Sequence, residues 1–220
     1  MTTDHEAARL TMVENQLRPN RIIEPRLLEA MGAVPRELFV PKAMRGVAYA
    51  DENIPLGGGR FLAEPLALGK LCQSAAVQPG DAALVVGDVT GYAAAVVARL
   101  AATVFLLLPP DAEAEAGAIE RRLGELGSDN VVVRAGDPAA GLPDQAPFDV
   151  ILLVGAVDRV PQALLDQLAE RGRLVTVVEE RRRGRVTVCL KVGGGVGRTT
   201  PFDAALPPLP GLRPAAEFVF

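Results

Sequence analysis

A short glycine-rich loop carries residue types that can bind a charged small molecule. It runs from Gly87 through Asp88 to Gly91 and follows residues 82–86, an apolar run typical of a buried strand. Glycine lets the backbone approach a ligand, and the N–H groups at the start of the next helix are free to bind one. Ligands in open parallel sheets bind at the carboxyl ends of strands. The loop is therefore a candidate binding site, although a tight turn without a ligand explains the same residues equally well.

Histidine and cysteine are scarce. His5 is the only histidine, and the cysteines, Cys72 and Cys189, show no CxxC spacing. Zinc binding and histidine-based catalysis need more such residues, so we expect no metal site. Two isolated cysteines in a reducing compartment are more often small core residues than a disulfide.

Around the loop, strand patterns alternate with helix patterns. The apolar runs expected to form strands are residues 82–86, 103–108, 130–134, 149–154 and 173–178. The helical patterns between them are residues 92–102, 111–126 and 161–170. This succession predicts an α/β fold with a doubly wound, mostly parallel sheet. A short polar turn then leads to the alternating segment 185–192, which predicts a C-terminal antiparallel hairpin.

The two ends of the chain follow other patterns. Residues 7–17 and 24–31 predict amphipathic helices, and a loop-rich stretch through Gly57–Gly59 follows them. Residues 200–214 are proline-rich, and residues 218–220 are a candidate terminal strand. With 220 residues, one domain can bury a sizeable core. We expect a single domain over residues 1–220, with an N-terminal helical cap (1–78), a core (79–192) and a tail (193–220) that docks on the core.

Charge and composition argue against two classes of partner. Lys and Arg total 23 against 27 Asp and Glu, and tryptophan is absent, so nucleic acid is not an expected partner. The basic run Arg181–Arg183 is more typical of a solvated turn than of an anion contact. No apolar run approaches the roughly eighteen residues of a membrane span. The N-terminus lacks a secretion or transit pattern, so we expect a soluble, cytoplasmic protein, with a monomer as the default.

Several separated segments match one protein family in order and spacing. The N-terminal matches are Met12–Arg18, Val34–Pro41, Ala48-Tyr49 and Ile54–Gly57, which resemble the start of the protein-L-isoaspartate O-methyltransferases. Residues 87–92 fall on that family's glycine-rich cofactor loop, and residues 146–149 and 172–175 match later strands. The resemblance covers about residues 10–178. It implies a Rossmann-like class I methyltransferase fold.

The resemblance also implies a reaction. The methyl donor would be S-adenosylmethionine, and the acceptor would be the side-chain carboxylate of an isoaspartyl residue in a damaged protein. A carboxylate with a pKa of about 4 is already ionised at pH 7, so the enzyme needs no general base and mainly positions the reactants. By resemblance the cofactor contacts are Gly87, Asp88, Gly91, Tyr92 and Asp137. An Asx turn before a proline explains Asp137 equally well.

The cofactor residues depart from the family pattern. Val89 replaces the middle glycine of the loop, and Val85 replaces an acidic residue in the strand before it. Asp88 is a candidate replacement for that acid. Leucines at 107–108 stand where the family keeps an acid for the ribose, and Asp111 is the nearest substitute. Losing one such hydrogen bond weakens binding by roughly ten- to a hundredfold.

The acceptor loop departs as well. The family's hydroxyl-bearing residues are replaced in Arg60, Phe61, Ala63 and Glu64. Arg60 is able to bind a carboxylate bidentately, or it is a solvated loop residue. Glu64, if it points inward, would repel a carboxylate at about 4 Å by roughly 1 to 4 kcal/mol.

Two functions remain open on these residues. One is an active isoaspartyl methyltransferase in which Arg60 and Asp88 compensate for the lost groups. The other is a non-catalytic methyltransferase-like protein with a binding or regulatory role, because the donor and acceptor loops are altered together. A dinucleotide-dependent oxidoreductase is disfavoured, since the loop lacks the G-x-G-x-x-G form.

Overall fold

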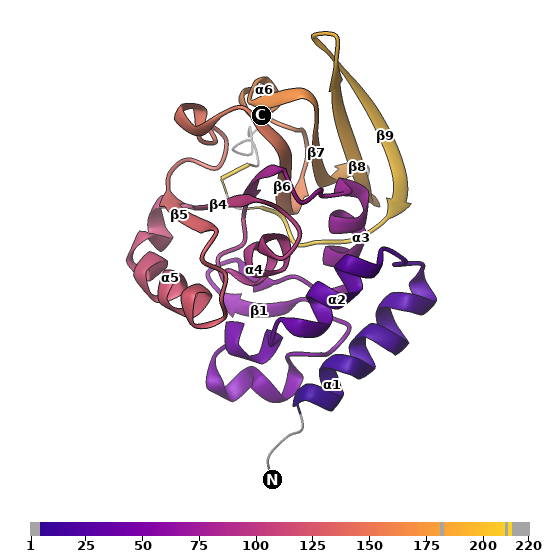
Figure 1. The fold of residues 1–220 in the computed structure, drawn as a ribbon, viewed down its shortest axis with the longest axis vertical. Helices are drawn as coiled ribbons and strands as arrows, with labels where there is room; N and C mark the ends of the chain where they lie inside the picture. Colours follow the sequence, from indigo (N-terminus) through magenta and orange to yellow (C-terminus); the bar gives the residue numbers. More distant parts are fainter. Residues whose placement is uncertain (1–4, 181–182, 210, 213–220) are drawn as a thin grey trace, which may run out of the picture.

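The computed structural model describes residues 5–180, 183–209 and 211–212, and a seven-stranded sheet forms its centre (Figure 1). The strand order is β5-β4-β3-β6-β7-β8-β9. The strands are β3 (Ala82–Val86), β4 (Thr103–Leu108), β5 (Val131–Ala135), β6 (Phe148–Val157), β7 (Leu168–Glu180), β8 (Arg183–Val192) and β9 (Gly195–Asp203). Strands β3 to β7 are parallel, and β8 and β9 join antiparallel. The predicted α/β fold with a mostly parallel sheet and a C-terminal hairpin is confirmed.

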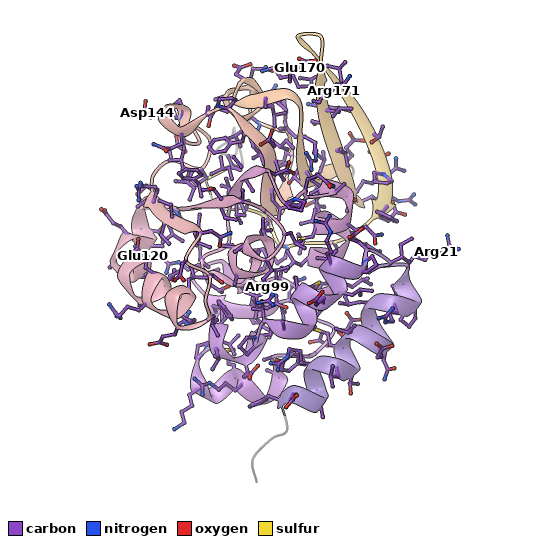
Figure 2. All side chains as sticks on the ribbon, in the orientation of Figure 1. Arg21, Arg99, Glu120, Asp144, Glu170 and Arg171 are labelled. Atoms are coloured by element: carbon purple, nitrogen blue, oxygen red, sulfur yellow. The ribbon has the colours of Figure 1, made fainter. Side chains whose placement is uncertain are left out.

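Continuous apolar runs form the central strands because both faces of the sheet are covered. In β3, Val85 packs into one core cluster, whereas Leu84 and Val86 pack into the other. Helices α3 (Pro65–Ala75), α4 (Tyr92–Ala98) and α5 (Ala116–Glu125) contribute to the first cluster, and α6 (Gln162–Asp166) contributes to the second. Figure 2 shows Glu120 on the outer side of α5, where its side chain is exposed.

The N-terminal region contains more regular structure than its sequence predicts. Its helical elements before α3 are α1 (His5–Met12), η1 (Val13–Leu17), η2 (Arg18–Asn20), α2 (Pro25–Ala33), η3 (Arg36–Phe39) and η4 (Lys42–Val47). The two predicted helical segments are confirmed. The supposed loop-rich stretch instead holds the hairpin β1 (Ile54–Gly57) and β2 (Arg60–Leu62), followed by α3. Helix α3 buries residues around most of its surface, so it lacks the amphipathic period by which a helix is recognised.

Four other predicted boundaries differ in the structure. The predicted helix 161–170 ends at Asp166, and β7 begins at Leu168. The predicted helix 92–102 ends at Ala98, and the predicted helix 111–126 begins as the 3-10 segment η5 (Pro110–Glu115). Residues 195–203 form β9, whereas the sequence suggested that the tail starts at 193. β9 is exposed over most of its length, so it carries little apolar signal.

The sequence-based expectations about the cysteines, the arginine run and membrane spans can be compared with the structure. Cys72 and Cys189 are both free and buried, which confirms that they are core residues. Arg183 begins β8 with an exposed side chain, whereas Arg181 and Arg182 lie outside the described residues, as does the candidate strand 218–220. None of the described helices is long and apolar enough to cross a membrane.

Candidate functional site

A pocket lies at the carboxyl ends of β3 and β4. Its lining residues come from the loops after three strands, from the tip of the β1–β2 hairpin and from the C-terminal segment: Gly58, Gly59, Arg60, Phe61, Gly87, Val89, Pro109, Asp111, Pro138 and Leu209. The chain passes from β3 to β4 and β5 on one side and returns to β6 on the other. Ligands bind at this kind of reversal in open α/β sheets, so the predicted loop lies where a ligand is expected.

Asp88 serves the loop itself. Its Oδ1 accepts hydrogen bonds from the backbone N–H of Thr90 (3.1 Å) and of Gly91 (3.0 Å), and from the Thr90 hydroxyl (2.7 Å). Its Oδ2 accepts from the N–H of Ala94 in α4 (3.0 Å). The residue is 4% exposed and does not line the pocket. Asp88 therefore caps the start of α4, and its predicted compensating role toward a cofactor has no support in this geometry.

The two loop glycines have different reasons to be glycine. Both have a positive φ, 87° at Gly87 and 86° at Gly91. Gly87 lines the pocket together with Val89, the residue that replaces the family's middle glycine. Gly91 is not among the lining residues, and a Cβ there would come within 2.9 Å of Ile119 in α5. Gly91 is therefore required for packing, whereas Gly87 faces the pocket.

The other two predicted cofactor residues lie away from the lining. The Tyr92 ring is fully buried on the side of the N-terminal cap, where it packs edge-on against Phe39 with centroids 5.4 Å apart. Asp137 is exposed, and its Oδ1 accepts a hydrogen bond from the N–H of Ala139 (2.9 Å), as an Asx turn requires. Its neighbour Pro138 lines the pocket instead.

Arg60 lies at the opening of the pocket and is paired with carboxylates there. It follows three glycines with positive φ at the tip of the β1–β2 hairpin, and its Nη1 lies 2.8 Å from Glu115 Oε1. Its Nη2 donates to the side-chain Oδ2 (3.1 Å) and the backbone O (3.0 Å) of Asp111. Glu115 and then Asp111 raise the pKa of Arg60 above its usual value. Arg60 is therefore paired with two carboxylates, and Asp111, the suggested ribose ligand, is engaged by it.

The rest of the acceptor loop is partly buried. Phe61 is buried and lines the pocket, and Ala63 is buried against the cap. Glu64 is half-buried at the start of α3, where its N–H donates to Asn53 Oδ1 (2.9 Å). Burial, followed by the nearby charge of Asp51, raises the pKa of the Glu64 carboxyl.

Arg36 was missed as a residue of this site. Its side chain is fully buried, with Nε donating to the carbonyl of Ala48 and Nη2 to that of Ala63, both at 2.5 Å. Its guanidinium carbon lies 4.9 Å from the centre of the Tyr92 ring. Burial lowers the pKa of Arg36. Arg36 thus joins the cap to the acceptor loop, and its sequence signal is its place in the family-matching segment Val34–Pro41.

Leu209 was also missed, and it lines the pocket beside Gly87. It is 1% exposed, and its N–H donates to the carbonyl of Ala156 (2.8 Å). A Cβ added at Gly155 would lie 2.6 Å from the Leu209 side chain, and one added at Gly87 would overlap it. No pattern in the sequence marks a distant leucine as part of this pocket.

The position of the pocket and its glycine suit an adenosyl cofactor, and the enclosed space between the lining residues is small. That enclosed space is about 30 Å³, which is enough for only a few water molecules. Asp88 does not line this space, and Asp111 Oδ2 accepts a hydrogen bond from Arg60. An adenosyl cofactor would therefore extend beyond this enclosed space. Among the described residues, no group of three or more His, Cys, Asp or Glu is placed to hold a metal ion.

Comparisons with known proteins relate the chain to one family. The family model described as protein-L-isoaspartate(D-aspartate) O-methyltransferase (PCMT) matches residues 8–202. A protein-L-isoaspartate O-methyltransferase of Gloeobacter violaceus is 37% identical over 205 residues, covering 92% of this chain and 98% of the relative. One of Methylorubrum extorquens is 43% identical over 191 residues, covering 83% and 82%.

Solved structures agree in fold. A structure described as protein-L-isoaspartate O-methyltransferase aligns with a TM-score of 0.77 at 21% identity, covering 95% of this chain and 67% of its own. Another, from Plasmodium falciparum, was solved in complex with S-adenosyl-L-homocysteine. It aligns with a TM-score of 0.76 at 20% identity, covering 94% and 98%.

Proposed function

Because the chain belongs to the protein-L-isoaspartate O-methyltransferase family, we propose that it methylates the side-chain carboxylate of isoaspartyl residues in proteins. The observation that carries this proposal is the extent of the family match, residues 8–202, which includes the acceptor hairpin and the strands around the pocket. Members of this family use S-adenosylmethionine, which supplies the methyl group from its sulfonium. The other roles fall to this chain's own residues.

Arg60 is proposed as the residue that binds the acceptor carboxylate. Its guanidinium already holds two carboxylates at the pocket mouth, so its geometry suits this kind of ligand. Asp111 and Glu115 are 74% and 47% exposed, and exposed ion pairs contribute little free energy. An incoming carboxylate would therefore replace one of them at small cost.

Donor binding is assigned to backbone groups and to surrounding apolar residues. At the end of β3, the backbone of Gly87 is proposed to contact the donor. By family resemblance, Asp137 would contact the adenosyl part once the pocket has opened. Phe61 and Val89 line the pocket and would exclude water from the transfer. The carboxylate nucleophile is ionised at neutral pH, so no base is required.

A methanol-release assay tests this function. Purified protein is incubated with S-adenosylmethionine and either an isoaspartyl peptide or the aspartyl peptide of the same sequence, and methanol from hydrolysis of the ester is measured. We expect methanol with the isoaspartyl peptide alone. No release above the blank, in protein that binds S-adenosylhomocysteine, would refute the proposed activity.

Substitution of Arg60 tests its proposed role. We expect Arg60→Met to raise the KM for the isoaspartyl peptide by about tenfold or more, since it removes a charge-assisted hydrogen bond, and to change kcat much less. Arg60→Lys, which keeps the charge but not the bidentate geometry, should lie between. Glu120→Gln on the outer face of α5 is the matched surface control. A KM unchanged in Arg60→Met would contradict the assignment.

A second candidate function is a non-catalytic binding or regulatory role. It is favoured by the small free space beside Leu209 and by the pairing of Arg60 with two internal carboxylates. Methyl transfer by the purified protein to any protein in a cell lysate would rule out this non-catalytic function.

The setting of the protein is also a proposal. We infer that it acts in the cytoplasm as a monomer. Nucleic acid is not a proposed partner, since acidic residues outnumber basic ones. Light scattering of the purified protein would measure its mass against the 23.1 kDa of one chain.

A further inference from the structure

The segment Leu206–Leu209, here called the C-terminal strap, lies across the carboxyl ends of the central strands. Figure 1 shows the yellow chain leave the end of β9 and run back across the molecule toward β6. The N–H of Ala156 donates to the carbonyl of Pro207 at 2.8 Å, and the N–H of Leu209 donates to the carbonyl of Ala156 at 2.8 Å. Two backbone hydrogen bonds thus attach the strap to β6.

The strap carries one side chain into the pocket. Leu209 lies against Gly87 after β3 and Gly155 in β6, and either glycine would collide with it if a Cβ were added. Gly87 is at the reversal between β3 and β6, where a ligand in this fold approaches the backbone, whereas Gly155 does not line the pocket. Leu209 and a ligand that used the backbone at Gly87 would therefore compete for one space.

We propose that the C-terminal strap occupies the pocket that binds the adenosyl cofactor, here called the donor pocket. The cofactor must displace the strap in order to bind. The proposal rests on the proposed function, because it concerns the donor of that reaction. The protein then exists in a closed form with Leu209 in the pocket and an open form with Leu209 withdrawn. Binding is weakened by the fraction of molecules that are closed.

The attachments of the strap suit an element that opens. Pro207 and Pro208 have no N–H to donate, so the strap cannot form a regular ladder with β6. The strap pairs with β6 through a single β-bridge, between Ala156 and Pro208. Segments with few backbone bonds open more readily than the sheet to which they attach. The central strands and Gly87 would keep their places when the strap leaves.

Calorimetric titration with S-adenosylhomocysteine tests the competition without depending on catalysis. Leu209→Ala removes the side chain that fills the pocket, and we expect it to bind at least about tenfold more tightly than the unaltered protein. Leu206→Ala is the matched control, because Leu206 is a buried leucine of the same strap that does not line the pocket. Its affinity should stay within about twofold of the unaltered protein.

A second variant leaves the strap sequence intact. Gly155→Ala adds a methyl group that would lie 2.6 Å from the Leu209 side chain and 3.3 Å from its Cα. It should push the strap outward and tighten binding in the same direction as Leu209→Ala. This variant keeps the test valid if Leu209→Ala folds poorly.

Hydrogen exchange in the unaltered protein gives an independent readout. The Leu209 amide is bonded to Ala156, so it exchanges slowly in the closed form. Saturating S-adenosylhomocysteine should accelerate its exchange if the strap is displaced. Slower or unchanged exchange with bound ligand would overturn the proposal, as would the absence of binding in both the unaltered protein and Leu209→Ala. Failure of the proposed function has a different signature, since ligand would bind without methanol release.

Discussion

Glu64 is a carboxylate whose surroundings oppose its charge. It is half-buried at the start of α3, and burial and then Asp51 raise the pKa of its carboxyl above the usual 4.5. The folded protein therefore binds this proton more tightly than the unfolded chain does. Ionisation costs folding free energy, and the cost is fully present above the folded pKa and absent below about pH 4.5.

The variant Glu64→Gln should remove that cost. At pH 7 we expect it to be more stable than the unaltered protein by less than about 1 kcal/mol, because solvent screens a half-buried group. The difference should shrink as pH falls through the raised pKa. Urea unfolding at several pH values would measure it, with Glu120→Gln as the exposed control. A difference that grows toward acid pH would contradict this explanation.

Single residues also show where sequence reasoning reached its limit. The sequence placed Gly87 and Arg60 at the pocket, because a strand-to-loop boundary and a family alignment are visible in one dimension. It could not tell that the Asp88 carboxylate turns back to cap α4, since a loop acid serves a ligand or its own backbone with equal ease. Leu209 enters from a segment more than a hundred residues after the loop, with no local signal.

At the scale of elements, α4 depends on its cap. Asp88 satisfies three backbone N–H groups at the start of this helix while 4% exposed. We expect Asp88→Ala to destabilise the protein by about 1 to 3 kcal/mol, because buried donors lose their acceptor. Asp137→Ala, at an exposed Asx turn with one such bond, should cost distinctly less. Urea unfolding would compare them, and equal losses would rule out the capping explanation.

Helices and strands differ in how clearly the sequence predicts them. The parallel strands are continuous apolar runs, so β3, β4 and β5 were predicted to within one residue, whereas β6 and β7 are longer than predicted. Helix α3 was not recognised, because it is buried on most sides and has no polar stripe. β9 was not recognised for the opposite reason, since it is an exposed edge strand without an apolar face. Hydrophobic periodicity arises when one face of an element is buried and the other is exposed. Helix α3 is mostly buried and β9 is mostly exposed, so neither shows a clear period.

At the scale of the whole molecule, Arg173 fastens the N-terminal cap to the sheet. From β7 its Nη2 donates to Asp81 Oδ2 and to the carbonyl of Ala76, both at 2.7 Å. Its Nε donates to the carbonyl of Ala75 at the end of α3. The Arg173 and Asp81 side chains are 16% and 12% exposed, so solvent screens this pair little.

Substitution of Arg173 should therefore affect the whole protein. We expect Arg173→Met to destabilise it by about 2 to 4 kcal/mol, because several carbonyls and a carboxylate lose a charged donor. Arg185→Met is the control, since Arg185 and Asp203 are 3.7 Å apart and largely exposed, and it should cost less than about 0.5 kcal/mol. Equal midpoints in urea would contradict the fastening role.

The turn between β8 and β9 offers a place to lengthen the chain. Gly193 and Gly194 have positive φ, and a Cβ at either would meet nothing within 4 Å. Figure 2 shows Glu170 and Arg171 near this turn, and Glu170 accepts the Gly193 N–H at 2.7 Å. Neither glycine lines the donor pocket. A longer loop costs little closure entropy, so a peptide tag inserted here would tether the protein to a surface with its pocket undisturbed.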